Sequence, residues 1–193
     1  MKSILKNGFV LLLMIAGLQA MAQKKAQSFT VSRDIPAEAS AVWAVVGEDY
    51  GAVANSHPKI VSSSYINGSL KGGEGAERVC NFNEKGTKFT HEKQIEYDAE
   101  NYRFKAQVFA AEGLYMDPDY SYAIYKVLPL GDNKSRLEIK MNFRTKPAFM
   151  GTIAKGKFMA TIEDYALAVE HHVKTGEKVT KDNFKGIKEQ YTD

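Results

Sequence analysis

The chain has 193 residues, of which 44% are hydrophobic and 25% charged, a composition that fits one globular domain with short flanking segments. Its formal net charge is +3, but two lysines and no acid lie in residues 1–22, which leaves 24 of the 26 basic side chains against 23 acidic ones. That near balance gives no basic excess that would indicate nucleic acid or an anionic membrane surface, and the single cysteine, Cys80, excludes an internal disulfide.

Residues 1–22 have the features of a secretory signal peptide. Lys2 and Lys6 form a positive start, an apolar run follows over residues 9–18, and a small-x-small cleavage pattern ends at Ala22. The apolar run is about half the length of a membrane-spanning helix, which needs about 20 residues. We therefore expect cleavage after Ala22, a periplasmic or secreted protein, and no stable membrane insertion. An uncleaved anchor or a buried helix is the alternative for this segment.

The rest of the chain begins with a predicted strand and two short helices. Residues 28–35 alternate between apolar and polar side chains, which predicts a strand that ends at Pro36. Residues 37–46 are rich in alanine and place apolar side chains on one helical face. A second short helical turn near residues 52–56 stops before Pro58, because the residue before a proline disfavours the helical conformation.

From residue 60 to residue 145 the pattern changes to strands separated by turn residues. The connectors are short and rich in glycine, asparagine and aspartate, so neighbouring strands should pair antiparallel as a meander. The last strand is the clearest, because Leu137, Ile139 and Met141 alternate with polar residues, which gives one buried and one solvated face. The six predicted strands are residues 60–67, 75–83, 87–97, 101–110, 119–129 and 134–145.

A long helix is predicted over residues 147–174. Pro147 suits its first turn, and apolar residues then recur at spacings of three and four along one stripe. Gly176 ends this helix, and residues 177–193 follow as a polar, basic C-terminal tail with one further helical turn.

The order of these elements predicts an α+β helix-grip fold over residues 28–176. A twisted, seven-stranded antiparallel sheet has one apolar face to cover, and the long C-terminal helix is the only predicted element large enough to cover it. The two short helices after the first strand can close only one end. A curved sheet wrapped around a single helix leaves internal space, and aromatic side chains would give that space an amphipathic lining. The alternative is that the same side chains fill a solid core.

Five short segments carry a resemblance to a known family. They are the strand, Ile-Pro-Ala turn and Val-Trp helix at 32–43, His57-Pro58, the Gly-Ala-Glu-Arg strand start at 75–78, Asp119-Tyr120, and the Val-Leu-Pro ending at 127–129. In this order they resemble the SRPBCC superfamily, which includes START lipid-transfer domains and birch-pollen-allergen-like proteins. The best match is to its bacterial polyketide cyclase/dehydrase-like group.

The resemblance covers residues 28–174 and implies the helix-grip fold with an internal pocket. It implies much less about activity, because ligand carriers, lipid-transfer domains, cyclases and regulatory modules share this fold. The export leader is a departure, since members of the group are often cytoplasmic.

No motif for metal, cofactor or nucleophilic chemistry is present, so we predict no catalytic residue, no metal and no cofactor. The four histidines do not form an i, i+4 pair with a helical glutamate, as a metalloprotease site requires. The glycine-rich segment at 72–75 lies between strands and lacks the helix N-terminus that binds phosphate. Cys80 is predicted to be a small buried hydrophobe and not a reactive thiol.

The best polar candidates for a pocket lie on two adjacent predicted strands. His91 shares its strand parity with Phe89, so an inward face would make it a titratable pocket residue, but Lys93 has the same parity and favours an outward face. Arg78 could point inward and hold a carboxylate or a polar ligand head. The alternative for Arg78 is an ion pair with Glu92 across the strands.

Three functions remain open at this point. The first is an exported, non-catalytic binding or carrier protein for a small apolar or amphipathic ligand, with no nucleic acid partner. The second is a cyclase or hydratase that uses His91, Glu92 and Arg78, and the third is an interaction module that acts through the basic tail. The predicted ligand-binding residues are Arg78, Phe82, Phe89, His91, Phe104, Tyr120, Tyr122, Met141, Phe143, Met150, Ile153, Met159 and Ile162.

Overall fold

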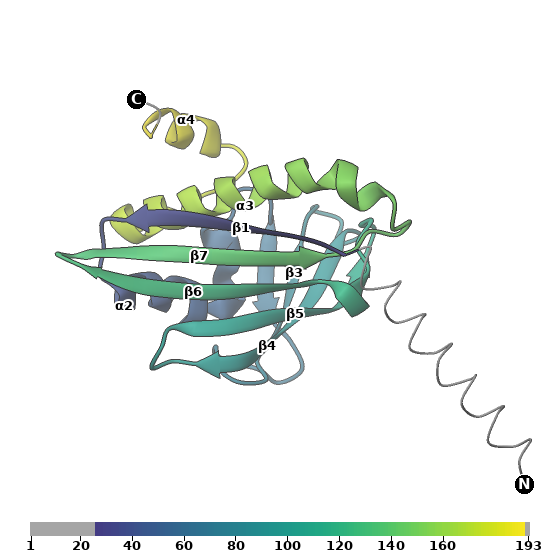
Figure 1. Ribbon diagram of the computed structural model, residues 1–193, viewed down its shortest axis with the longest axis horizontal. Coiled ribbons are helices and arrows are strands. Elements are labelled where there is room, and N and C mark those ends of the chain that lie inside the picture. The colour runs from purple at the N-terminus through teal and green to yellow at the C-terminus, as the bar shows by residue number, and fades with distance from the viewer. Residues whose placement is uncertain (1–25, 192–193) are drawn as a thin grey trace, which may run out of the picture.

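A computed structural model of the protein describes residues 26–191, so the predicted leader lies outside the described residues. Figure 1 shows a curved sheet with the long helix α3 running along β1 and β7, and with short helical segments behind the sheet. The elements are β1 (Gln27–Ile35), α2 (Ala39–Trp43), η1 (Ala44–Glu48), η2 (Tyr50–Asn55), β2 (Ser62–Tyr65), β3 (Glu77–Asn81), β4 (Phe89–Asp98), β5 (Arg103–Glu112), η3 (Pro118–Tyr120), β6 (Tyr122–Gly131), β7 (Lys134–Phe143), α3 (Met150–Thr175) and α4 (Phe184–Glu189).

The seven strands form one antiparallel sheet in the order β1-β7-β6-β5-β4-β3-β2. Strands β2 to β7 are a meander, as the short turn-forming connectors predicted, and β1 closes the sheet by pairing with β7. The helix-grip prediction is therefore confirmed: a seven-stranded curved sheet, two short helical segments after the first strand, and a long C-terminal helix.

The predicted helix at 37–46 is α2 followed directly by η1, a π-helical turn. Gly47 lies in this turn against the indole of Trp43. A Cβ at Gly47 would lie 2.7 Å from three indole atoms, so the close approach requires glycine. The indole is 2% exposed and packs against the rings of Tyr97, Tyr102 and Phe104. Trp43 thus anchors the short helices to the sheet.

The core lies between the sheet and α3. Leu137 and Ile139 on β7 are fully buried, as their alternation predicted. The prediction that Tyr122 faces the pocket implies that residues 122, 124 and 126 form the inner face of β6, but the structure buries Ala123, Tyr125 and Val127 instead. The reason is the pairing register: Tyr125 lies opposite Ile139, and directly opposite residues of an antiparallel pair share a face.

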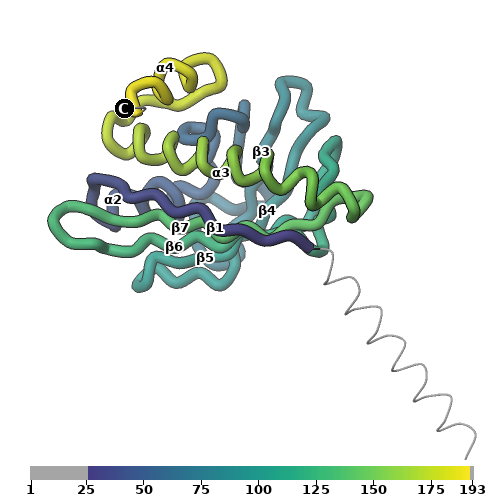
Figure 2. Tube along the Cα trace, turned by 45° about the horizontal axis from the view of Figure 1, so that its top comes forward, coloured from purple at the N-terminus to yellow at the C-terminus, as the bar shows by residue number. Residues whose placement is uncertain are grey.

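The C-terminal segment packs on the domain and is not a solvated tail. The backbone N–H of Val179 donates to the carbonyl of Asn55 at 2.8 Å, and Ser56 forms a parallel β-bridge with Val179. Val179 is fully buried, and Ile187 of α4 is 3% exposed against Leu167 of α3. In Figure 2 the segment turns back after α3 and brings α4 over that helix.

Replacement of Ile187 tests whether this segment contributes to stability. We expect Ile187→Ala to lower the free energy of unfolding by about 2–4 kcal/mol, because it deletes a buried side chain and leaves a cavity. Lys185→Ala, two residues away and exposed, should change it by less than about 0.5 kcal/mol. Urea unfolding of both variants measures the difference, and equal midpoints for the two would contradict the packing of α4.

Candidate ligand-binding cavity

A cavity of about 110 Å³ lies between the concave face of the sheet and α3. Its apolar wall includes Ala106 and Val108 on β5, Met141 on β7, and Phe158 and Ile162 on α3. The remaining wall is polar. Its polar members are His57, Arg78, Thr90, Glu92, Tyr125, Thr161 and Tyr165.

Arg78 and Glu92 form a buried ion pair in the cavity wall. They are cross-strand partners on β3 and β4, and both Nε and Nη2 of Arg78 donate to Oε2 of Glu92, at 3.0 and 2.7 Å. The third donor, Nη1, bonds the carbonyl of Tyr50 at 2.7 Å, and the guanidinium carbon lies 3.8 Å from the centroid of that ring. Thr90 donates to the other oxygen of Glu92 at 2.9 Å. The alternative of a cross-strand ion pair is therefore the one that the structure adopts.

His57 contributes a neutral imidazole to the same wall. Burial lowers its pKa to about 3, and the positive charges of Arg78 and Lys59 act in the same direction. Its Nδ1 accepts the backbone N–H of Lys59 at 3.1 Å, so the ring hydrogen of the neutral form lies on Nε2. The ring stacks on Tyr165 with centroids 4.8 Å apart. His57 therefore presents a fixed N–H donor and no charge.

Two buried phenols complete the polar wall. Burial raises the pKa of Tyr125 to about 12 and that of Tyr165 well above its usual range, so both hydroxyls stay protonated. Tyr165 is 2% exposed, and its hydroxyl makes no hydrogen bond with any residue between 26 and 191. Buried hydroxyls are nearly always paired with protein or water, so this one is available to a molecule inside the cavity.

Cys80 lies beside this polar cluster, and its thiol is unreactive. The thiol is fully buried, and burial raises its pKa to about 12. The thiolate is the reactive form of cysteine, so Cys80 acts as a small core residue, as the sequence indicated.

Five of the predicted ligand-binding residues border the cavity. Tyr122 contributes only an edge of the cavity wall. Its ring also contacts the convex face of the sheet, where Nζ of Lys105 lies 4.4 Å from the ring centroid. The five residues are Arg78, Phe82, Tyr122, Met141 and Ile162.

Phe89 and His91 lie on the convex face, so the prediction of an inward His91 is wrong. Their rings contact each other at 4.8 Å, and His91 also contacts the half-exposed Phe109. The inward residues of β4 are Thr90, Glu92 and Gln94. This inner face is polar, so the position of the aromatic residues indicated the wrong side of β4. His91 therefore does not converge with Arg78 and Glu92.

Three predicted residues pack outside the cavity. Phe104 stacks on Tyr125 at 4.5 Å and is fully buried in the core, and Phe143 is buried against Phe158 at the same separation. Tyr120 belongs to η3, where the guanidinium carbon of Arg144 lies 3.4 Å from its ring centroid. Phe104 and Phe143 therefore fill the core, as the alternative of a packed core described, whereas Tyr120 is only partly buried outside it.

Met150, Ile153 and Met159 are on the part of α3 that faces away from the cavity. Ile153 is 76% exposed and Met159 is 38% exposed. The face of α3 toward the cavity carries Phe158, Ile162 and Tyr165, at the i, i+4 and i+7 spacing of one helical stripe. That helical spacing could have identified Phe158 and Tyr165 as cavity residues. Nothing in the pattern of β4 indicated that Thr90 lines the cavity.

Within residues 26–191 no group of three or more histidine, cysteine or acidic side chains is arranged to hold a metal ion. Over the same residues, no helix is long and apolar enough to cross a membrane.

The fold and its cavity define a helix-grip protein of the SRPBCC superfamily. A family model described as "Polyketide cyclase / dehydrase and lipid transport" matches residues 26–170, and the chain belongs to that family. No curated protein matches the sequence.

Several solved structures share the fold at low sequence identity. A Thermobifida fusca protein solved by NMR is 20% identical with a TM-score of 0.63, and the match covers 79% of this chain and 96% of that one. Norcoclaurine synthase from Thalictrum flavum, in complex with dopamine and hydroxybenzaldehyde, is 19% identical with a TM-score of 0.54, over 77% and 86%. Ara h 8.0201 is 15% identical with a TM-score of 0.53, over 78% and 99%.

His57 predicts a loss of stability in mild acid. Its pKa is about 3 in the folded protein and about 6.5 in the unfolded chain, so protons bind the unfolded chain preferentially between these values. The stability that the neutral ring contributes is complete above pH 6.5 and declines as the pH falls towards 3. We expect His57 to lower the free energy of unfolding by about 1.5–2 kcal/mol between pH 6.5 and pH 5.

Urea unfolding of the wild type and of His57→Asn at these two pH values measures that contribution. Asparagine keeps an acceptor for the Lys59 amide and does not titrate. The fall in stability should be smaller in the variant by about the stated amount. If both proteins lose the same free energy, His57 is not the group responsible.

Proposed function

We propose that this protein is an exported binding or carrier protein that holds a small amphipathic molecule in the cavity between the sheet and α3. The observation that carries the proposal is the unpartnered hydroxyl of Tyr165, which lies in a mostly apolar cavity beside the Arg78–Glu92 pair. An apolar wall with a few convergent polar groups is the usual form of a small-molecule site. The apolar body of the ligand contacts the α3 and β5 side chains, and its polar group accepts a hydrogen bond from Tyr165 or from Nε2 of His57.

The size of the cavity limits what it holds in the described conformation. Pockets for drug-sized ligands measure about 300–1,000 Å³, whereas this one is about 110 Å³. A larger ligand requires the walls to separate, and the first half of α3 is the wall with the least packing: over residues 152–160 most side chains are exposed. We propose that the ligand widens the cavity at this end.

A binding role accounts for the polar wall better than the cyclase or hydratase alternative. The guanidinium of Arg78 directs its donors to Glu92 and to a backbone carbonyl, and His91 lies on the other side of the sheet. The norcoclaurine synthase complex supports the idea that this fold holds small aromatic molecules, and the family description includes lipid transport. Neither specifies a reaction for this chain.

Blocking the cavity tests the proposal. Ile162→Trp places a larger ring at the cavity wall and should abolish saturable binding of an uncharged fluorescent probe, and it should remove any small molecule that co-purifies in native mass spectrometry. Ile153→Trp is the matched control, because it makes the same change at an exposed position of the same helix. A wild-type protein that neither carries a small molecule nor binds the probe would exclude the binding role.

Export is tested separately from binding. The basic start, the apolar run and the small-x-small site of residues 1–22 support cleavage after Ala22. We expect the protein from the native host to begin at Gln23 and to be absent from the cytoplasmic fraction. Ala22→Pro should block processing and leave the leader attached. Intact-mass spectrometry distinguishes the cleaved chain from the chain that keeps its leader. A wild-type protein from the native host that retains residues 1–22 would contradict export by cleavage.

A further inference from the structure

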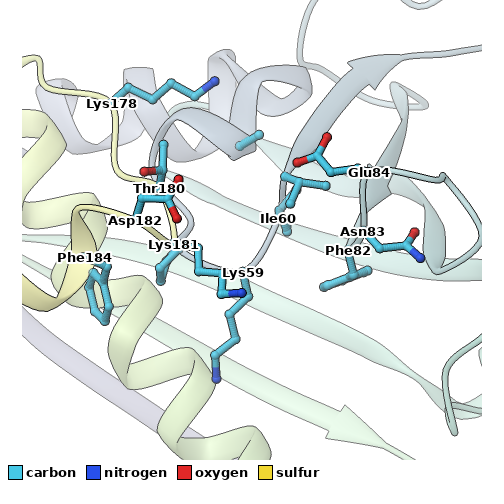
Figure 3. A pocket seen from close by; sticks show the side chains of 13 residues that line it. Lys59, Ile60, Phe82, Asn83, Glu84, Lys178, Thr180, Lys181, Asp182 and Phe184 are labelled. Atoms are coloured by element: carbon cyan, nitrogen blue, oxygen red, sulfur yellow. The ribbon is translucent and has the colours of Figure 1, made fainter.

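A second hollow of about 800 Å³ lies on the surface next to the cavity and opens to solvent. Figure 3 shows its two sides: residues 178–184 of the C-terminal segment on one side, and Ile60 with the end of β3 on the other. We call this hollow the outer groove. It exists because the C-terminal segment packs beside η2 through the Ser56–Val179 bridge.

The outer groove and the cavity beneath α3 share part of their walls. Ile60 and Phe82 line both spaces, so these two side chains form the partition between them. Lys59 at the groove donates from Nζ to Oγ1 of Thr161 at 2.8 Å, and Thr161 lines the cavity. The two spaces are therefore adjacent compartments of one region.

One member of the partition, Phe82, is free to change its rotamer, whereas Ile60 is 7% exposed and belongs to the core. Phe82 is only partly buried and follows the end of β3, before a turn whose residues 84–88 are exposed. Ile60 stands in a loop in which its N–H reaches the carbonyl of His57 at a long 3.4 Å. A rotamer change at Phe82 needs no change in the sheet, and such changes are fast at partly exposed positions.

The charges of the outer groove favour an anion. Lys178 and Lys181 on the C-terminal segment are exposed, and neither forms an ion pair with any residue from 26 to 191. Together with Lys59 they give three ammonium groups against the carboxylates of Glu84 and Asp182. Ile60 and Phe82, the apolar side chains that the groove shares with the cavity, lie where the two spaces meet.

We propose that the outer groove and the cavity form one binding site for an elongated amphiphile with an anionic head. The chain passes between Ile60 and Phe82 into the cavity, and the carboxylate or other anionic head accepts hydrogen bonds from Lys178 and Lys181. This inference rests on the proposed binding function, and it assigns the C-terminal segment a role in recognising the head group.

Three probes with the same twelve-carbon chain separate the contributions of head and chain. Dodecanoate, dodecanol and dodecyltrimethylammonium are titrated calorimetrically below their micelle-forming concentrations. Wild-type protein should bind dodecanoate at least about tenfold more tightly than the other two, because hydrogen bonds to charged groups contribute about 1.5–3 kcal/mol. Lys178→Glu with Lys181→Glu should remove or reverse this preference.

The control is the pair Lys140→Glu with Lys185→Glu, which makes the same change in net charge at exposed positions outside the groove. It should keep the wild-type preference, and urea unfolding confirms that both double variants are folded. Equal binding of dodecanoate and dodecanol by the wild type, or a preference that survives Lys178→Glu with Lys181→Glu, overturns the assignment of the groove and leaves the cavity function intact. Failure of all three chains to bind removes the binding function itself.

Discussion

The Arg78–Glu92 pair is the interaction on which the interior of this protein depends. A guanidinium that is 4% exposed would be very costly without a partner, and the register of β3 against β4 places Glu92 directly opposite. The third donor of Arg78 bonds the carbonyl of Tyr50 in η2, so the same side chain connects the short helices to the sheet. Loss of one partner would leave a buried charge unpaired, at a cost of about 3–5 kcal/mol.

This pair also explains why the space beneath α3 is not packed like an ordinary apolar core. Apolar side chains cannot satisfy the polar groups around a buried ion pair, so the neighbouring wall consists of a neutral imidazole and two protonated phenols. Nδ1 of His57 accepts a hydrogen bond from the backbone N–H of Lys59 within the protein. Neither the hydroxyl of Tyr165 nor Nε2 of His57 has a hydrogen-bond partner among residues 26–191, which makes these two groups the points at which a guest molecule gains most.

The architecture followed from local patterns, whereas the cavity did not. Alternation along β7, turn residues between strands and one apolar helical stripe were sufficient for the order of strands and the position of α3. The inner face of β4 was misassigned because it is polar. Gln94 is fully buried there, with its amide donating to the carbonyl of Gly47 and accepting from the N–H of Gly73. Backbone partners from distant segments make that burial stable, and no pattern within β4 reveals them.

The packing of the C-terminal segment was likewise not predictable from its local sequence pattern. Its composition is polar and basic, which is typical of a solvated tail, yet Val179 and Ile187 are buried where it packs against η2 and α3. Two buried apolar residues in a polar segment give no periodic signal, because the intervening residues face solvent. Once the segment is in place, its lysines necessarily line the rim above Ile60 and Phe82. The packing of the segment, in which Val179 and Ile187 are buried, therefore determines where these charges lie, and the charge of the groove is a consequence of the fold and not of the net charge of the chain.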